Sequence, residues 1–129
     1  MFTIEQIKEA HAKVKSGADF PNYIQDLIIL GVKGYDTFVN DGHVEYYGVN
    51  GYSVISDEKY QPISIAATPN KELFIEFLVK HQQGETDYLT FCNHAGQSGI
   101  AKWRGDIIEM TCTYFDNAEN EILIEKIPS

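Results

Sequence analysis

Alternation of apolar and polar positions divides the chain into helical and extended segments. Thr3 and Gln6 have the spacing of a capping box, and apolar side chains recur behind them at helical period until residues 16–17. A second helix is expected after Asp19, a residue that can cap it, and Gly31 is a suitable left-handed terminator. The buried face of this second helix should consist of Ile24, Leu27, Ile28 and Leu30.

The segment from about Gly34 to about Val49 predicts a β-hairpin. Asp41-Gly42 is the favoured pair for a two-residue type I′ turn, in which both residues have positive φ. In that register one face of the hairpin suits the core, and the other forms a half-exposed surface. The core face comprises Tyr35, Thr37, Val39, Val44 and Tyr46, and the surface comprises Asp36, Phe38, Asn40, His43, Glu45 and Tyr47.

Two further helices and several strands follow. Asn70 should cap a third helix that Gly84 ends, and Thr86 should cap a fourth helix that closes with the glycines at 96 and 99. The other strands are expected at residues 52–56, 63–67, 100–104, 108–114 and 122–127, with a turn at Gly105-Asp106.

These elements predict an α+β fold, with an antiparallel sheet of about five to seven strands and about four helices packed on one face. Each half of the chain has two helices followed by strands that start with a similar motif, Gly31 to Tyr35 and Gly99 to Trp103. This order suggests an internal α-α-β-β duplication. The length of 129 residues favours a single domain over residues 1–129.

The composition, with 43% hydrophobic and 22% charged residues, is typical of a folded protein. A formal net charge of −9 leaves no basic footprint for nucleic acid and argues against an anionic membrane surface as partner. We expect no membrane span, because the apolar runs are too short, and no secretory signal, because the first residues form neither a basic nor an apolar leader region. Two cysteines are too few for a disulfide framework, so we expect a cytoplasmic protein with free thiols.

One set of motifs extends over nearly the whole chain. It comprises Gly31-Val32, Tyr35, Asp41-Gly42, Tyr46, Gly48, His81-Gln82, Gly84, Thr86-Asp87-Tyr88, Thr90-Phe91-Cys92, Gly99, Lys102-Trp103, Asp106 and Met110 to Tyr114. With these motifs the chain resembles a small bacterial family of unknown function that is labelled phage-envelope-protein-like or YbcV-like. The resemblance implies no established activity and carries over no catalytic residues.

The densest cluster of reactive side chains comprises His81, Asp87, Cys92 and His94, with Trp103 and Cys112 further along the chain. In one interpretation Cys92 is a nucleophile and His81 or His94 is its base. However, Cys92 and His94 should point about 200° apart around a helix axis. Both cysteines also fall on apolar stripes, so we expect buried thiols and assign no catalytic residue.

Neither a metal nor a cofactor is expected. His81, Cys92, His94 and Cys112 are of zinc-ligand type, but their spacing matches no known zinc site. His81 and Asp87 should meet across the Gly84 turn as a structural clasp. His94 should lie about 10 Å from Asp87 along the fourth helix, outside any shared catalytic constellation.

Two other features have candidate chemistry. Asp36 and Glu45 share a strand face. Paired carboxylates can act in glycoside or acid–base chemistry when burial separates their pKa values. We expect instead that this face of the sheet is solvated. Amphipathic aromatic residues on the strands either fill the core or line a small-molecule pocket or an interface. They include Tyr46, Tyr47, Tyr52, Tyr60, Trp103 and Tyr114.

The preferred function is therefore a non-enzymatic binding or interaction domain, of prophage origin, for an unknown small molecule or protein. The candidate binding residues are His81, Asp87, Cys92, His94, Trp103 and Tyr46. Two alternatives stay open, a small enzyme with a Cys/His site between His81 and Cys112, and a phage structural component. A homo-oligomer is compatible with either role.

Overall fold

The computed structural model describes residues 2–14 and 19–127. Over these residues it contains four α-helices and six strands, which confirms the α+β class. The first half contains α1 (Ile4–His11), α2 (Phe20–Leu30), β1 (Gly34–Phe38), β2 (Val44–Tyr47), a short 3₁₀ turn η2 (Val49–Gly51) and β3 (Ser53–Ile55). The second half contains α3 (Lys71–Gln82), α4 (Tyr88–Gln97), β4 (Lys102–Asp106), β5 (Thr111–Phe115) and β6 (Glu121–Lys126).

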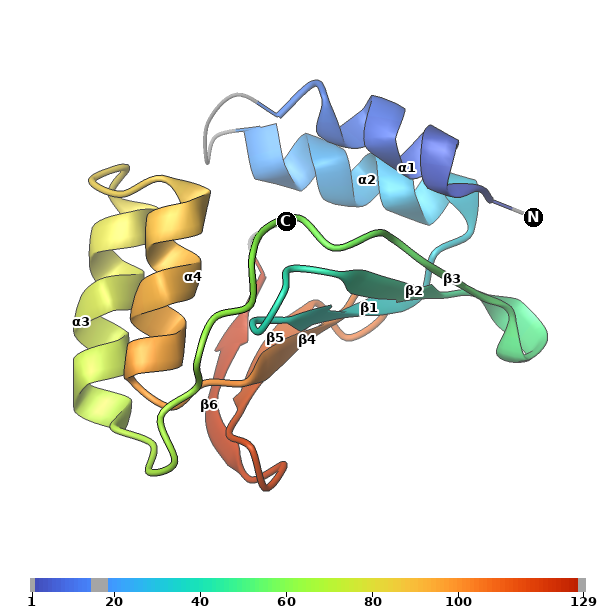
Figure 1. Cartoon of the computed structure of the whole chain (residues 1–129). Helices are drawn as coiled ribbons and strands as arrows, with labels where there is room; N and C mark the ends of the chain where they lie inside the picture. Colours follow the sequence, from blue (N-terminus) through green and yellow to red (C-terminus); the bar gives the residue numbers. More distant parts are fainter. Residues whose placement is uncertain (1, 15–18, 128–129) are drawn as a thin grey trace.

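The six strands form one antiparallel sheet in the order β3-β2-β1-β4-β5-β6. The two helix pairs, α1–α2 and α3–α4, lie on the same side of this sheet (Figure 1). The strand order is symmetric, because the first strand of each half lies in the centre and the third lies at an edge. Each half thus repeats the predicted α-α-β-β order and continues into a third strand, at the places where strands were predicted at residues 52–56 and 122–127.

Equivalent positions of the two halves meet at the centre of the sheet. Asp36 of β1 pairs with Arg104 of β4, which follows it by 68 residues. The same offset relates Gly31 to Gly99, and both glycines have positive φ, 96° and 84°, just after α2 and α4. The internal two-fold arrangement therefore extends from the helix ends into the sheet.

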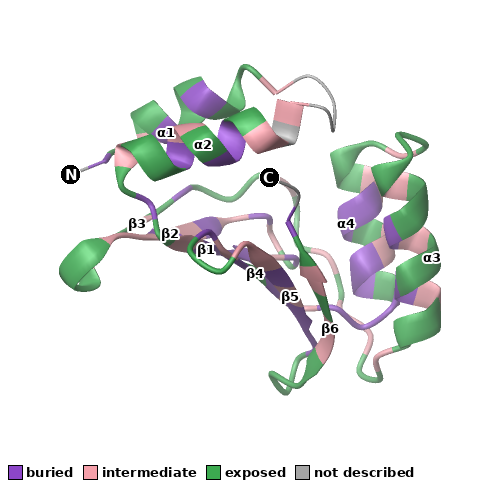
Figure 2. Ribbon diagram, turned by 180° about the vertical axis from the view of Figure 1, so that it is seen from behind, coloured by how far each residue is buried: buried purple, intermediate pink, exposed green. Residues whose placement is uncertain are grey.

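The core lies between the sheet and the two helix pairs. Tyr35, Tyr46, Trp103 and Tyr114 point from the central strands toward the helices, which contribute Ile24, Leu27, Phe74 and Cys92. Figure 2 shows these buried segments on the inner sides of the helices and the sheet. No helix in the described ranges is long and apolar enough to cross a membrane.

The helix ends follow the predicted caps with small differences. The Thr3 capping box is present, but α1 already ends at His11, and the predicted closure at residues 16–17 lies outside the described residues. Ile28 of α2 is 43% exposed, contrary to prediction, because Tyr23 lies on the buried stripe one turn before Leu27. In α4 the cap is Asp87 rather than Thr86, and its Oδ1 accepts a hydrogen bond from the Thr90 amide at 2.8 Å.

The hairpin turn differs from the predicted type I′ geometry. Only Gly42 of the Asp41-Gly42 pair has positive φ, at 80°. The Phe38 amide donates to the His43 carbonyl at 3.0 Å, so the loop is longer and the register is shifted by two residues from prediction. Because strand side chains alternate with period two, this shift preserves both faces, and the predicted core face is buried.

One strand prediction and one turn prediction were wrong. Residues 63–67 form an irregular segment that packs closely on α4, where a Cβ on Gly96 would lie 2.9 Å from the Ser64 carbonyl oxygen. The predicted turn at Gly105-Asp106 is instead the end of β4. Gly105 is required there because a Cβ would lie 2.3 Å from Cζ of Tyr35.

Candidate functional site

The sheet has an open face, which we define as the side on which none of the helices of residues 2–14 and 19–127 lies (Figure 1). Across its middle, one residue from each strand lies opposite the next: Ile55, Glu45, Asp36, Arg104, Thr113 and Ile124. The two outer isoleucines are 60% and 54% exposed, whereas Asp36 is 2% exposed. This is the reverse of the usual distribution, in which apolar groups are buried and charges are solvated.

Asp36 is held by side chains from both neighbouring strands. Arg104 on β4 donates from Nε to Oδ1 at 2.7 Å and from Nη2 to Oδ2 at 3.1 Å. Tyr47 on β2 donates its hydroxyl to Oδ2 at 2.6 Å. Burial alone would raise the pKa of Asp36, but the hydrogen bonds from Arg104 and Tyr47 outweigh it and lower the pKa below its usual value. The carboxylate is therefore charged at neutral pH.

Tyr47 links Asp36 to a second carboxylate. Its hydroxyl also lies 3.2 Å from Oε1 of Glu45, but a phenol has one proton, and the shorter contact to Asp36 holds it. Burial and then the hydrogen bond to Asp36 raise the pKa of Tyr47, so the phenol keeps its proton. The predicted face shared by Asp36 and Glu45 thus exists, with one carboxylate buried.

Aromatic rings lie beside the charged centre. The Arg104 guanidinium carbon is 5.6 Å from the centroid of the Phe115 ring. The Lys102 ammonium lies 5.1 Å from the same centroid and 6.0 Å from that of Phe38, and it forms an ion pair with Glu119 at 2.9 Å. At these distances the quadrupole of each ring attracts the cation that lies over it.

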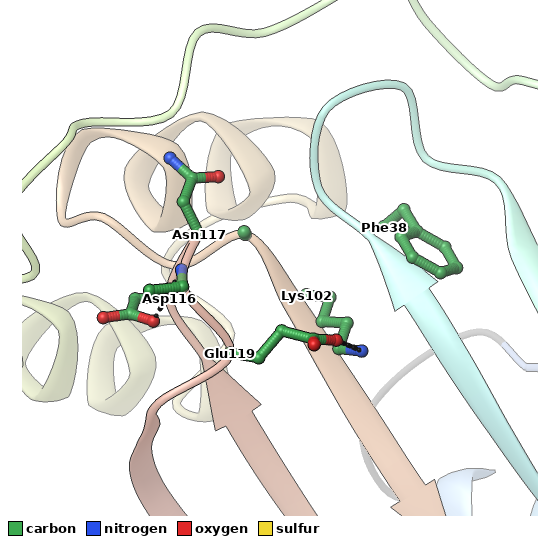
Figure 3. A pocket seen from close by; sticks show the side chains of 7 residues that line it. Phe38, Lys102, Asp116, Asn117 and Glu119 are labelled. Carbon is green, nitrogen blue, oxygen red and sulfur yellow. Dashed lines mark hydrogen bonds and ion pairs between the residues drawn. The ribbon is translucent and has the colours of Figure 1, made fainter.

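Two shallow hollows flank the Asp36–Arg104 pair. The first, of about 360 Å³, lies between Phe38, Lys102 and the loop of residues 116–119 (Figure 3). The second, of about 300 Å³, is lined by Lys33, Gly34, Tyr35, Tyr47, Arg104, Gly105, Asp106, Ile108 and Glu109. The internal repeat relates the two hollows, because Gly34 of the second and Lys102 of the first occupy equivalent positions.

Three of the six predicted binding residues belong to the core. Tyr46 packs 6.2 Å from Tyr35, and Trp103 packs 5.6 Å from Phe91, both measured between ring centroids. Cys92 has no exposed surface. Burial raises the pKa of the Cys92 thiol, although hydrogen bonds with Tyr60 and Tyr88 oppose the shift. Burial likewise raises the pKa of Cys112, to about 12.

The other three predicted residues have separate partners around α4. His81 stacks on Phe91 with centroids 4.4 Å apart, and its Nδ1 lies 3.1 Å from the Thr86 carbonyl oxygen, so the predicted clasp forms with Thr86 rather than Asp87. Hydrogen bonds from Thr90, and then the charge of His81, lower the pKa of Asp87. His94 stacks on Phe77 at 3.9 Å, and its buried Nδ1 has no hydrogen-bond partner among the described residues.

These contacts do not assemble the predicted residues into one site. Their roles in binding stay predictions. Within the described ranges, no three His, Cys, Asp or Glu side chains are close enough together to hold a metal ion.

Arg104 was missed as a site residue, Tyr47 was predicted only as one of the aromatic residues that fill the core or line a pocket or an interface, and Asp36 was expected to be solvated. A signal was available in the repeat, since aligning Gly31 to Tyr35 with Gly99 to Trp103 places Asp36 and Arg104 at the same position. Opposite charges at equivalent positions of paired strands indicate a cross-strand ion pair.

Comparison with known proteins identifies a family without assigning an activity. No curated protein matches the chain. The model of the family described as "Protein of unknown function (DUF1398)" matches residues 8–126, and the chain therefore belongs to that family.

Proposed function

We propose that the protein is a non-enzymatic binding domain and that the open face of its sheet is the binding surface. The observation that supports this is the buried, charged Asp36 at the centre of a face that no helix covers. Burying an ion pair costs desolvation free energy, and apolar residues of similar size often stabilise a fold as well or better. The ion pair is therefore better explained by recognition than by stability.

The chemistry of the surrounding surface favours the same role. Arg104, Tyr47, Phe38 and Phe115 combine planar donors and rings, and arginine and aromatic residues are enriched where proteins bind partners. Asp36 and Phe115 hold the Arg104 guanidinium in place before any ligand arrives. Such preorganisation reduces the entropy that is lost on binding.

The Cys/His enzyme is less well supported. Cys92 is fully buried and its pKa is raised, whereas a nucleophilic cysteine needs an accessible thiolate. We also propose a cytoplasmic location, since two free thiols suit a reducing compartment. A prophage origin and a virion role have no support beyond the resemblance of the sequence.

The test is a fragment library screened against the ¹⁵N-labelled chain by amide chemical shifts. Hits should shift the amides of Tyr47 and Arg104 on the open face and leave Ile75 on α3 unchanged. Hits that cluster instead on the helices or around Cys92 would contradict the proposal.

A further inference from the structure

The hollow beside Arg104, lined by Lys33, Tyr47, Asp106, Ile108 and Glu109 among others, contains charges of both signs. We call it the Arg104 hollow. Its lining comes from three separate parts of the chain, the start of β1, the end of β2 and the segment from β4 into the following loop. Its volume of about 300 Å³ lies at the lower end of the range of small-molecule sites.

Arg104 lines this hollow and retains unused donors. A guanidinium has five N–H groups, and Asp36 accepts from Nε and Nη2. No other hydrogen-bond partner of the guanidinium occurs among the described residues, and the side chain is 50% exposed. The free edge is planar and held in position, which is the geometry that binds a carboxylate through two parallel hydrogen bonds.

The carboxylates that line the hollow, Asp106 and Glu109, form no ion pair with Arg104, whose charge is paired with Asp36 outside the lining. Asp106 lies two residues further on the same strand face, at a backbone distance of about 7 Å. Its Oδ1 accepts from the amides of Ile108 and Glu109 at 3.0 and 2.9 Å, which keeps Asp106 turned toward the loop. No ion pair joins Glu109 to another described residue, and its side chain is exposed. Opposite charges are thus held apart across one hollow.

We propose that the Arg104 hollow binds a small zwitterion of the amino-acid class, an inference that rests on the proposed function. The ligand carboxylate would pair with Arg104, and its ammonium group with Asp106 and Glu109. A purely anionic ligand would be repelled by the carboxylates of the hollow, on a chain of net charge −9. A purely cationic ligand would be repelled by Arg104 and Lys33. Ile108, 68% exposed, offers apolar contact to a ligand side chain.

The equivalent hollow in Figure 3 lacks this property. There the Lys102 ammonium is paired with Glu119 at 2.9 Å, and Asp116 accepts from the Ala118 and Asn120 amides within its own loop. The one cation of its lining is therefore already paired with a carboxylate of the same lining, so this hollow serves as an internal control.

The experiment titrates the ¹⁵N-labelled full chain with L-leucine, and with two analogues that keep one charge each, 4-methylpentanoate and 3-methylbutylamine. Leucine should cause saturable shifts at Gly34, Tyr47, Asp106 and Ile108. Each analogue should bind at least about tenfold more weakly, as expected from the loss of a charge-assisted hydrogen bond. Equal affinities for all three compounds, or no saturable shift with leucine, would overturn the inference.

Variants separate the two hollows. Arg104→Lys keeps a charge for Asp36 but lacks the planar edge, so it should weaken leucine binding at least about tenfold. Glu119→Gln should leave the affinity unchanged, and melting curves confirm that both variants fold. An unchanged affinity of Arg104→Lys for leucine would contradict the inference. If leucine does not bind but library fragments still shift amides on the open face, only the zwitterion assignment is wrong. If the fragments shift amides elsewhere, the proposed function is wrong as well.

Discussion

Asp36 shows how one residue can set the character of a whole surface. Its charge is buried beneath Arg104 and Tyr47, on a face where the outer isoleucines remain exposed. Removing the carboxylate would release Arg104 from its fixed position and leave the Tyr47 hydroxyl with a weaker acceptor. The Asp36 carboxylate therefore determines how Arg104 and Tyr47 are arranged on this surface.

The first prediction concerns Asp36→Asn. Because the pKa of Asp36 is lowered in the folded state, its charge stabilises the fold above the unfolded pKa of about 4, and this contribution is lost as the pH falls through the folded pKa. The variant should lose about 2 kcal/mol of unfolding free energy at pH 7 and much less at pH 3. Urea denaturation at both pH values measures this, and an equal loss at both would show that the charge is unimportant.

Gly105 is the second residue with a specific requirement. A methyl group there would enter the ring of Tyr35, so Gly105→Ala should destabilise the fold by about 1–3 kcal/mol through overpacking. In a Tyr35→Ala background the same substitution should cost far less, because the ring is gone. A double-mutant cycle from thermal melts makes the comparison. Equal costs in both backgrounds would place the strain elsewhere.

At the scale of elements, helix starts could be predicted and turn geometry could not. The Thr3 capping box and the Asn70 cap are local patterns, and the helices begin where they indicate. The Asp41-Gly42 turn depends on more distant groups, since Tyr60 packs against Gly42 and donates its hydroxyl to the Val39 carbonyl at 2.6 Å. Such tertiary contacts leave no trace in the local pattern.

The observed turn makes a prediction that distinguishes it from type I′. Gly42→Ala should cost about 1–2 kcal/mol, because the residue has positive φ and a Cβ would lie 2.6 Å from the Tyr60 ring. Asp41→Gly should bring no gain in stability, since Asp41 has no positive φ to relieve and its Oδ1 accepts from the His43 amide at 3.0 Å. Chemical denaturation of the two variants tests this. If Asp41→Gly stabilised the fold, this result would support the type I′ geometry and contradict the observed turn.

For the molecule as a whole, the fold class was predictable from periodicity, whereas the candidate site was not. The type of a side chain does not show whether it is accessible, since Cys92, Trp103 and Tyr46 are packed inside. Asp36, Tyr47 and Arg104 come from three different strands. The burial of Asp36 therefore depends on which strands are neighbours in the sheet. Strand order is a global property that the alternation of side chains cannot supply.

The packing of the whole molecule predicts the behaviour of both thiols. Cys92 lies on α4 and Cys112 on β5, and both are buried with raised pKa values. Labelling by an aromatic disulfide without denaturant should be slow at both, and should accelerate with urea in step with global unfolding. Fast labelling of Cys92 in the native state would instead revive the Cys/His enzyme.

The strand order at the centre of the sheet also bears on how the two halves recognise each other. β1 and β4 are equivalent strands, and the same edge of either could in principle accept a copy of itself from another chain. Such like-with-like pairing would set Asp36 against Asp36, or Arg104 against Arg104, and like charges directly opposite on neighbouring strands repel. Only the correct pairing of first half with second half joins opposite signs. The Asp36–Arg104 ion pair thus favours pairing of β1 with β4 and disfavours pairing of either strand with a copy of itself.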